Sequence, residues 1–140
     1  MVVAGLMSGT SVDAIEVAFV DIRGRGLHSK VSFRAHASVP YPSKVRSRII
    51  QLASGAPTTA QEISQLNFLI GELFASAFLK ACERTRIRAA SVKLIGSHGQ
   101  TVHHQPNNES VCGIPVRSTL QLGEPAVISA RSGKIGRAHV

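Results

Sequence analysis

Aromatic residues, cysteines and acidic residues are all scarce in this sequence of 140 residues. Only six aromatic side chains are present, and none is Trp. None alternates with basic residues, as the base-stacking surface of a nucleic-acid-binding protein would require. No segment approaches the roughly 18–20 uncharged apolar residues that cross a bilayer. We therefore expect neither a nucleic-acid partner nor a membrane span.

The two cysteines, Cys82 and Cys112, lack the spacing of metal ligands. The apolar amino terminus is short, has no basic segment before it and leads directly into residues 8–11, which are Ser-Gly-Thr-Ser. It is therefore interpreted as a buried strand and not as a signal peptide. Without an export signal, we expect two reduced thiols in the cytoplasm rather than a disulfide.

Basic residues outnumber acidic ones by 16 to 8, which gives a formal net charge of +8. They fall into small separate groups: Arg23 and Arg25; Lys44, Arg46 and Arg48; Arg84, Arg86 and Arg88; Arg131, Lys134 and Arg137. Because these groups are scattered, we interpret them as solvated surface charge and not as a nucleic-acid-binding patch.

Hydrophobic residues make up 44% of the chain, enough to bury the core of one domain. Apolar runs and alternation predict strands at residues 2–7, 14–21, 31–39, 91–95 and 119–122. Three- and four-residue spacing predicts helices at 44–53, at about 60–82 behind a capping box, and from residue 125 onward. Three strands, two helices and a further strand indicate a single α/β domain.

The first candidate site is the small-residue loop from Gly9 to Asp13, between the first two predicted strands. Such a loop lets the backbone approach an anion closely, and Thr10 and Ser11 add hydroxyl donors. Asp13 would repel a phosphate unless a cation such as Mg²⁺ lay between them. The sequence has no Walker A motif, because Gly133-Lys134 lacks the required neighbours. An ordinary hairpin turn and a phosphate loop both remain open.

The second candidate site, residues 97–101, follows the strand predicted to end at Ile95. Ligands of open α/β sheets bind at that edge, and Gln100 and Thr101 carry the neutral donors and acceptors that suit sugar hydroxyls. We interpret His98 as a structural histidine with its hydrogen bonds satisfied. Together with the nearby histidines it lacks the acidic or cysteine ligands of a metal site.

The third candidate is Glu124, which precedes the last predicted helix. A glycine turn before a helix start can present a carboxylate or backbone N–H groups to a ligand. A capped helix start is the default interpretation.

Three segments together resemble successive motifs of anhydro-N-acetylmuramic acid kinases: residues 5–13, 95–101 and 119–126. The resemblance runs from residue 2 to about residue 133. It implies a ribonuclease-H-like domain of the sugar kinase, Hsp70 and actin superfamily, with a mixed sheet and flanking helices. It also implies transfer of the ATP γ-phosphoryl group to the 6-hydroxyl of a 1,6-anhydro sugar with hydrolytic opening of the anhydro ring. The product, N-acetylmuramic acid 6-phosphate, would enter cell-wall recycling.

The resemblance also implies roles for individual residues. The ATP-phosphate site would comprise Gly9, Thr10, Ser11, Val12, Asp13, Ala14, Ile15 and Glu16. Asp13 would bind Mg²⁺ directly or through water. The substrate site would comprise Ser97, His98, Gly99, Gln100, Thr101 and Glu124. The partner is then a small-molecule anhydro sugar, and a homodimer of the full-length protein remains open.

The sequence departs from the family pattern at two places. Ala14 and Glu16 stand where the family usually has Gly and Asp, and because Ala adopts a positive φ less cheaply, we expect a slightly altered loop. Beyond residue 133 the family continues into a strand with an Asp-Phe-Arg motif, whose Asp is the catalytic base. Residues 134–140 do not match it.

We therefore expect a truncated kinase domain at residues 1–133, a foreign tail at 134–140, no catalytic residue in the chain and no activity of the fragment alone. The alternatives are a levoglucosan kinase, which acts on 1,6-anhydroglucose, and a non-catalytic remnant or binding module.

Overall fold

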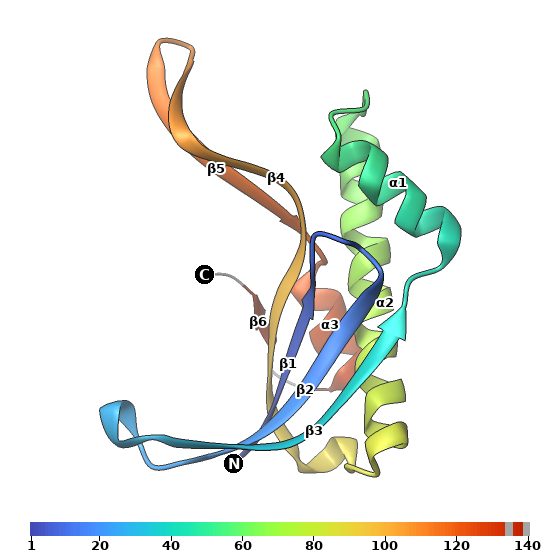
Figure 1. Ribbon diagram of the computed structural model, residues 1–140, viewed down its shortest axis with the longest axis vertical. Helices are drawn as coiled ribbons and strands as arrows, with labels where there is room; N and C mark the ends of the chain where they lie inside the picture. The colour runs from blue at the N-terminus through green and yellow to red at the C-terminus, as the bar shows by residue number, and fades with distance from the viewer. Residues whose placement is uncertain (134–135, 139–140) are drawn as a thin grey trace.

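The computed structural model describes residues 1–133 and 136–138, which form a mixed sheet with three helices packed on one face (Figure 1). The strands are β1 (Val2–Ser8), β2 (Ala14–Arg23), β3 (Lys30–Pro40), β4 (Val92–Val111), β5 (Ile114–Leu122) and β6 (Gly136–Ala138). The helices are α1 (Ser43–Ala53), α2 (Ala60–Thr85) and α3 (Pro125–Ser132), with short 3-10 turns at Gly26–His28 and Ala89–Ser91. The predicted α/β fold and its order of elements are confirmed.

The sheet has the strand order β3-β2-β1-β4-β5, and β6 pairs with β4. β1, β2 and β3 are antiparallel neighbours, whereas β4 runs parallel to β1. A parallel neighbour requires a crossover connection, which α1 and α2 provide. As a result, β1 and β4 lie side by side at the centre of the sheet and point the same way.

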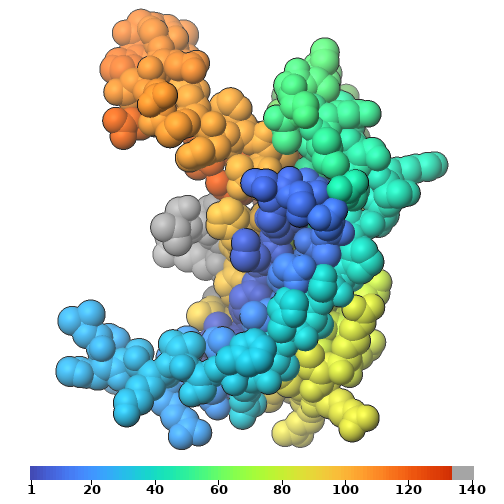
Figure 2. Space-filling model, viewed as in Figure 1, coloured from blue at the N-terminus to red at the C-terminus, as the bar shows by residue number. Residues whose placement is uncertain are grey.

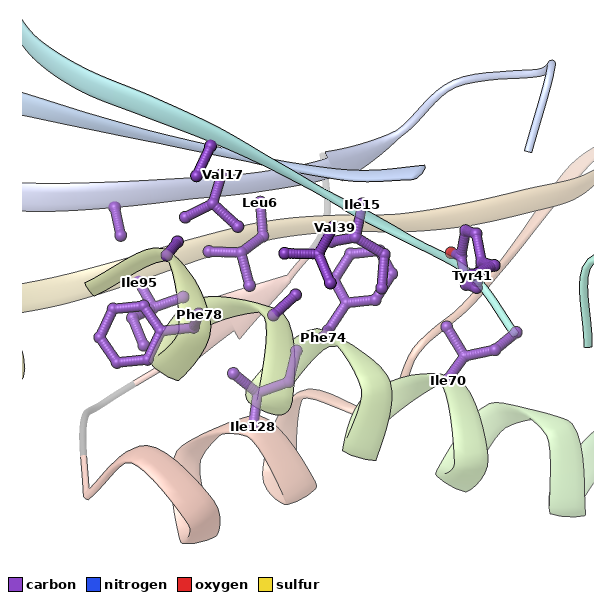
Figure 3. Packing of buried hydrophobic residues seen from close by; sticks show 14 of the residues in the cluster. Leu6, Ile15, Val17, Val39, Tyr41, Ile70, Phe74, Phe78, Ile95 and Ile128 are labelled. Atoms are coloured by element: carbon purple, nitrogen blue, oxygen red, sulfur yellow. The ribbon is translucent and has the colours of Figure 1, made fainter. Parts of the chain in front are cut away.

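The core lies between the sheet and α2. Figure 3 shows Leu6, Ile15 and Val17 of the sheet facing Phe74 and Phe78 of α2, and all five side chains are buried. The apolar stripe predicted for α2 faces this core because residues three and four apart share one helix face.

The capping box predicted at the start of α2 is half present. The Thr59 hydroxyl accepts a hydrogen bond from the Glu62 backbone N–H at 3.1 Å, as predicted. The Glu62 side chain binds Arg48 and Thr58 instead of returning to the N-cap. A carboxylate within reach of a guanidinium gains a charge-assisted bond, which is stronger than a neutral cap. The Arg48–Glu62 pair thereby joins α1 to α2.

β4 is much longer than the strand predicted at residues 91–95. β4 continues to Val111, and β5 starts at Ile114 rather than at residue 119. Residues 103–120 of these two strands form a hairpin, the β4–β5 arm, that projects beyond the helices (Figures 1 and 2). The β4 half of the arm is polar almost throughout, so it lacks the apolar alternation that marks a half-buried strand. The β5 half does alternate, but its apolar side chains, Ile114, Val116 and Leu120, are exposed.

The alternating segment predicted at residues 31–39 is a strand, β3, but only some of its apolar side chains are buried. Ala37 and Val39 are buried, whereas Val31 and Phe33 are 64% and 70% exposed. The first half of β3 pairs with the end of β2 in a second projecting hairpin, so that the molecule is crescent-shaped in Figure 2. Period-two alternation thus predicted the strand but not how much of it is buried by the helices.

Several of the basic residues form ion pairs at the surface, and the side chains of Arg46 and Arg131 are 42% and 63% exposed. Arg131 binds both carboxylate oxygens of Glu72, Arg34 pairs with Asp21, and Arg46 and Arg48 pair with acidic residues as well.

The cysteines form no disulfide in the part of the chain that is described; Cys82 is buried and Cys112 is exposed. Among the same residues, none of the helices has the length and apolar character of a membrane span.

Candidate functional site

The loop that joins β1 to β2, residues 9–13, is a tight turn held by one buried side chain. The Val12 N–H donates to the Gly9 carbonyl oxygen at 3.1 Å. Val12 has a φ of 53°, a left-handed conformation that costs a β-branched residue about 1–3 kcal/mol. Its side chain is only 2% exposed, so core packing offsets the strain. The polar residues around it, Thr10, Ser11 and Asp13, are all exposed.

Two residues outside the loop hold its carboxyl-terminal half. Arg46, in the first turn of α1, donates from Nη2 to the Ser11 carbonyl oxygen at 3.2 Å and to Asp13 Oδ1 at 2.8 Å. The Tyr41 N–H donates to the Asp13 carbonyl oxygen at 3.3 Å. The loop is therefore tied to α1 and to the segment that precedes it.

The strain expected at Ala14 does not arise. Ala14 is already part of β2, and its φ is not positive; the left-handed residue of this loop is Val12. Of the two residues that follow, Ile15 is buried in the core, and Glu16 accepts hydrogen bonds from Ser38 and from His36 of β3. Within residues 9–16, the groups exposed to a ligand are therefore those of the loop itself.

The second candidate segment, residues 97–101, lies inside β4 and not beyond the end of a strand, which corrects the prediction. β4 pairs with β1 through Leu6 opposite Ser97 and Ser8 opposite Gln100. The Gln100 side chain is 1% exposed and donates to the Thr101 carbonyl oxygen at 3.1 Å and to the Gly9 carbonyl oxygen at 3.5 Å. The two segments are therefore neighbours, in contact through Gln100 and Gly9.

Gly99 is required by the local backbone. Its φ is +73°, and a Cβ at this position would lie 2.7 Å from the Leu122 carbonyl oxygen. β5 can approach β4 this closely only because no side chain intervenes.

The interpretation of the neighbouring His98 as a structural histidine is wrong, because its side chain is exposed and has no hydrogen bond among the described residues. It remains a predicted substrate contact.

A small group of buried polar side chains lies beneath the two segments. The hydroxyl groups of Ser8 and Ser97 are buried without a hydrogen-bond partner in the described part of the chain. The Tyr41 hydroxyl donates to Gln100 Oε1 at 3.5 Å. Burial raises the pKa of the Tyr41 phenol to about 12. Tyr41 therefore stays protonated and neutral at physiological pH.

Glu124 caps α3, as the default interpretation had it. Its Oε1 accepts from the Ala126 N–H at 3.1 Å, and its Oε2 accepts from Asn67 Nδ2 at 3.0 Å. Asn67 also accepts from the Gly123 N–H at 2.8 Å, so one α2 side chain fixes the turn before α3. A pocket of about 370 Å³ lies beside these residues, lined by Ser64 and Gln121 among others. The role of Glu124 in substrate binding remains a prediction.

The donor set at the loop fits Mg²⁺ held mainly by its nucleotide. In the described residues, no three His, Cys, Asp or Glu side chains lie close enough to form a metal site of their own. Mg²⁺ typically binds through one or two carboxylates together with substrate phosphates and water. A single exposed carboxylate, that of Asp13, beside a loop with free backbone donors matches this arrangement.

Sequence reasoning missed Arg46, Tyr41 and Asn67. The sequence gives no sign of a role for Tyr41, which follows a strand, or for Asn67, which is one polar residue within a helix. Arg46 does carry a weak signal. Cations are unfavourable in the first turn of a helix, and α1 has two there, at Lys44 and Arg46, with no acidic residue.

Comparisons with known proteins identify relatives of this chain. A family model for anhydro-N-acetylmuramic acid kinase matches residues 1–136. An anhydro-N-acetylmuramic acid kinase of Caldanaerobacter subterraneus subsp. tengcongensis is 47% identical over 131 residues, which are 94% of this chain and 33% of the relative. One of Bacillus cereus (strain Q1) is 45% identical over 129 residues, with 92% and 33% coverage. The chain spans about a third of the length of the curated relatives it matches.

Proposed function

Because the chain belongs to the anhydro-N-acetylmuramic acid kinase family, and so to the sugar kinase and actin superfamily, we propose that it supplies the phosphate-binding part of an ATP-dependent sugar kinase. The reaction is phosphorylation of 1,6-anhydro-N-acetylmuramic acid by ATP and Mg²⁺, with hydrolytic opening of the anhydro ring. The product is N-acetylmuramic acid 6-phosphate, formed in the cytoplasm for peptidoglycan recycling.

The observation that carries this proposal is the contact between the loop at residues 9–13 and the β4 segment at residues 97–101. Phosphoryl transfer needs the phosphate donor and the acceptor alcohol to be adjacent and nearly in line. Gln100 reaches the Gly9 carbonyl oxygen, so a phosphate over the loop would lie beside a sugar bound at Thr101 and His98. Two such segments on opposite edges of the sheet would have contradicted a kinase.

In this proposal each loop residue has a distinct task. Exposed backbone N–H groups and the hydroxyls of Thr10 and Ser11 bind phosphate oxygens. Asp13 would hold Mg²⁺ directly or through water, and the bound cation would supply positive charge against the phosphates. The base that activates the nucleophile lies beyond residue 133 in the family pattern, so this chain provides binding and orientation and leaves proton transfer to the remainder of a complete kinase.

The first prediction concerns the chain by itself: it has no measurable sugar-dependent ATP consumption. Loss of a general base alone costs about 10²–10⁴-fold, and an open cleft admits water that screens the charges on the transferring group. The measurement compares this chain with a full-length kinase that carries the same segment, using 1,6-anhydro-N-acetylmuramic acid and levoglucosan. Turnover by the chain within tenfold of the full-length enzyme would refute the proposal that proton transfer needs the remainder of the kinase. Faster turnover of levoglucosan by the full-length enzyme would show that levoglucosan is the substrate.

A further inference from the structure

We propose that Arg46 is a positioning residue for Asp13 and for the loop that carries it. This inference rests on the proposed function and deepens it. One guanidinium nitrogen, Nη2, donates both to Asp13 Oδ1 and to the Ser11 carbonyl oxygen, at 2.8 and 3.2 Å. Arg46 thus connects the carboxylate and the backbone on either side of the strained residue Val12.

The position of Arg46 on α1 indicates that it serves the loop and not the helix. The first turn of α1 has no acidic residue, and its N-cap, Pro42, makes no side-chain capping bond. The amino-terminal end of a helix carries partial positive charge, which disfavours a cation there. Lys44 occupies the same turn, is exposed and has no side-chain partner among the described residues. Of these two cations, Arg46 alone reaches across to the loop.

The contact leaves Asp13 able to bind a cation. Arg46 occupies Oδ1, whereas Oδ2 has no hydrogen-bond partner in the described part of the chain. A group that bonds one oxygen of a metal-binding carboxylate fixes the direction of the other, and such outer contacts typically change metal affinity or activity by about 10–100-fold when they are removed. Arg46 also keeps the Ser11 carbonyl oxygen engaged, so that this acceptor does not turn toward the phosphates.

The test is carried out in a full-length kinase that carries this segment, with three variants. Arg46→Gln removes the charge and the two-way contact, Arg46→Lys keeps the charge, and Lys44→Gln removes an equal charge from the same helix turn. The readouts are kcat, the KM values for ATP and for sugar, the Mg²⁺ concentration at half-maximal rate, and the dissociation constant of Mg·ADP by calorimetry. Thermal melting verifies that each variant is folded.

We expect Arg46→Gln to raise the Mg²⁺ requirement and to weaken Mg·ADP binding by about 10–100-fold. The KM for sugar stays unchanged, Arg46→Lys recovers part of the loss, and Lys44→Gln behaves as the parent does. In an Asp13→Asn background, Arg46→Gln has less than a twofold further effect, because residues that act through one another are not additive.

The inference is overturned if Arg46→Gln leaves the Mg²⁺ requirement and Mg·ADP binding within twofold of the parent, or if its effect is fully retained in the Asp13→Asn background. A purely structural role would lower the melting temperature and change the KM values for both substrates together. A parent enzyme without sugar-dependent turnover would instead refute the proposed function, and the Mg·ADP measurement would then decide the role of Arg46 by itself.

Discussion

The two segments that meet at the candidate site are built in opposite ways. The loop at residues 9–13 is irregular and exposed, and contacts from Tyr41, Arg46 and Gln100 hold it from outside. The segment at residues 97–101 is part of β4, with a shift of register against β1 between Ser97 and Gln100, and its shape follows from backbone pairing and from Gly99. In the proposed function, the loop presents its exposed groups to the phosphates, and the β4 segment provides a scaffold together with the sugar contacts at His98 and Thr101.

This difference implies that substitutions in the two segments affect different properties of the protein. A substitution at Thr10, Ser11 or Asp13 of the loop removes an exposed polar group and leaves the packed core intact. A substitution in the β4 segment disturbs the sheet. Catalysis and stability should therefore separate between the two segments, and the following predictions test that separation.

The largest effect is expected from Asp13→Asn in a full-length kinase carrying this segment. Removing a charged group that acts mainly in the transition state lowers kcat by on the order of 10²–10³-fold. Because Asp13 is exposed and its backbone contact to Tyr41 remains, the melting temperature and the KM for sugar should stay close to the parent values. Steady-state kinetics with a thermal melt measure both. An unchanged kcat would mean that Asp13 only shapes the turn.

The next effect is on stability, at Gly99. Gly99→Ala places a Cβ 2.7 Å from the Leu122 carbonyl oxygen at a φ of +73°. The strain and the displacement of β5 together cost about 2–4 kcal/mol. Gly96→Ala is the matched control on the same strand, because its added Cβ meets no atom within 4 Å and its φ is not positive. Urea unfolding of both variants measures the difference. Equal midpoints would show that β4 and β5 separate without cost.

Much of the fold could be predicted from the sequence because the signals are local. The stripe from Leu66 to Ala81 repeats at helical spacing, and it packs on the sheet as expected. The small-residue loop between two apolar runs indicated a hairpin, and that hairpin is β1–β2. The rule that ligands bind at one edge of an open α/β sheet pointed to residues 97–101, and Gln100 in this segment contacts the loop at the Gly9 carbonyl oxygen.

The features that the sequence did not reveal depend on contacts between distant residues. β4 continues past Thr101 because β5 pairs with it. The exposed arm that the two strands form contains Pro106 and Pro115, and proline usually interrupts a strand. Pro is tolerated in strands whose N–H would face solvent. Arg46 was grouped with surface charge because sequence spacing does not show that α1 starts beside the loop. Side-chain pairing across 33 residues is a property of the folded chain.

The smallest effect concerns the support of α1, which carries Arg46, and it appears as a pH dependence. Arg48 of α1 donates to both carboxylate oxygens of Glu62, with a further bond from Thr58. These bonds, that from Arg48 above all, lower the pKa of Glu62 from its ordinary 4.5 to about 2. A depressed pKa stabilises the folded state above the unfolded-state value, and that stabilisation is lost as the pH falls from about 4.5 toward 2.

Glu62→Gln removes the charge and its titration while it keeps a hydrogen-bond acceptor. The melting temperature of the variant should therefore lie below that of the parent at neutral pH, and the gap should close as the pH falls from about 4.5 toward 2. Glu83→Gln is the matched control, since Glu83 is exposed on the same helix and has no side-chain partner among the described residues. Thermal melts across this pH range measure both gaps. A gap for Glu62→Gln that stays constant with pH would mean that the pair with Arg48 does not hold α1 in place, and that the loop depends on Arg46 and Tyr41 without help from α2.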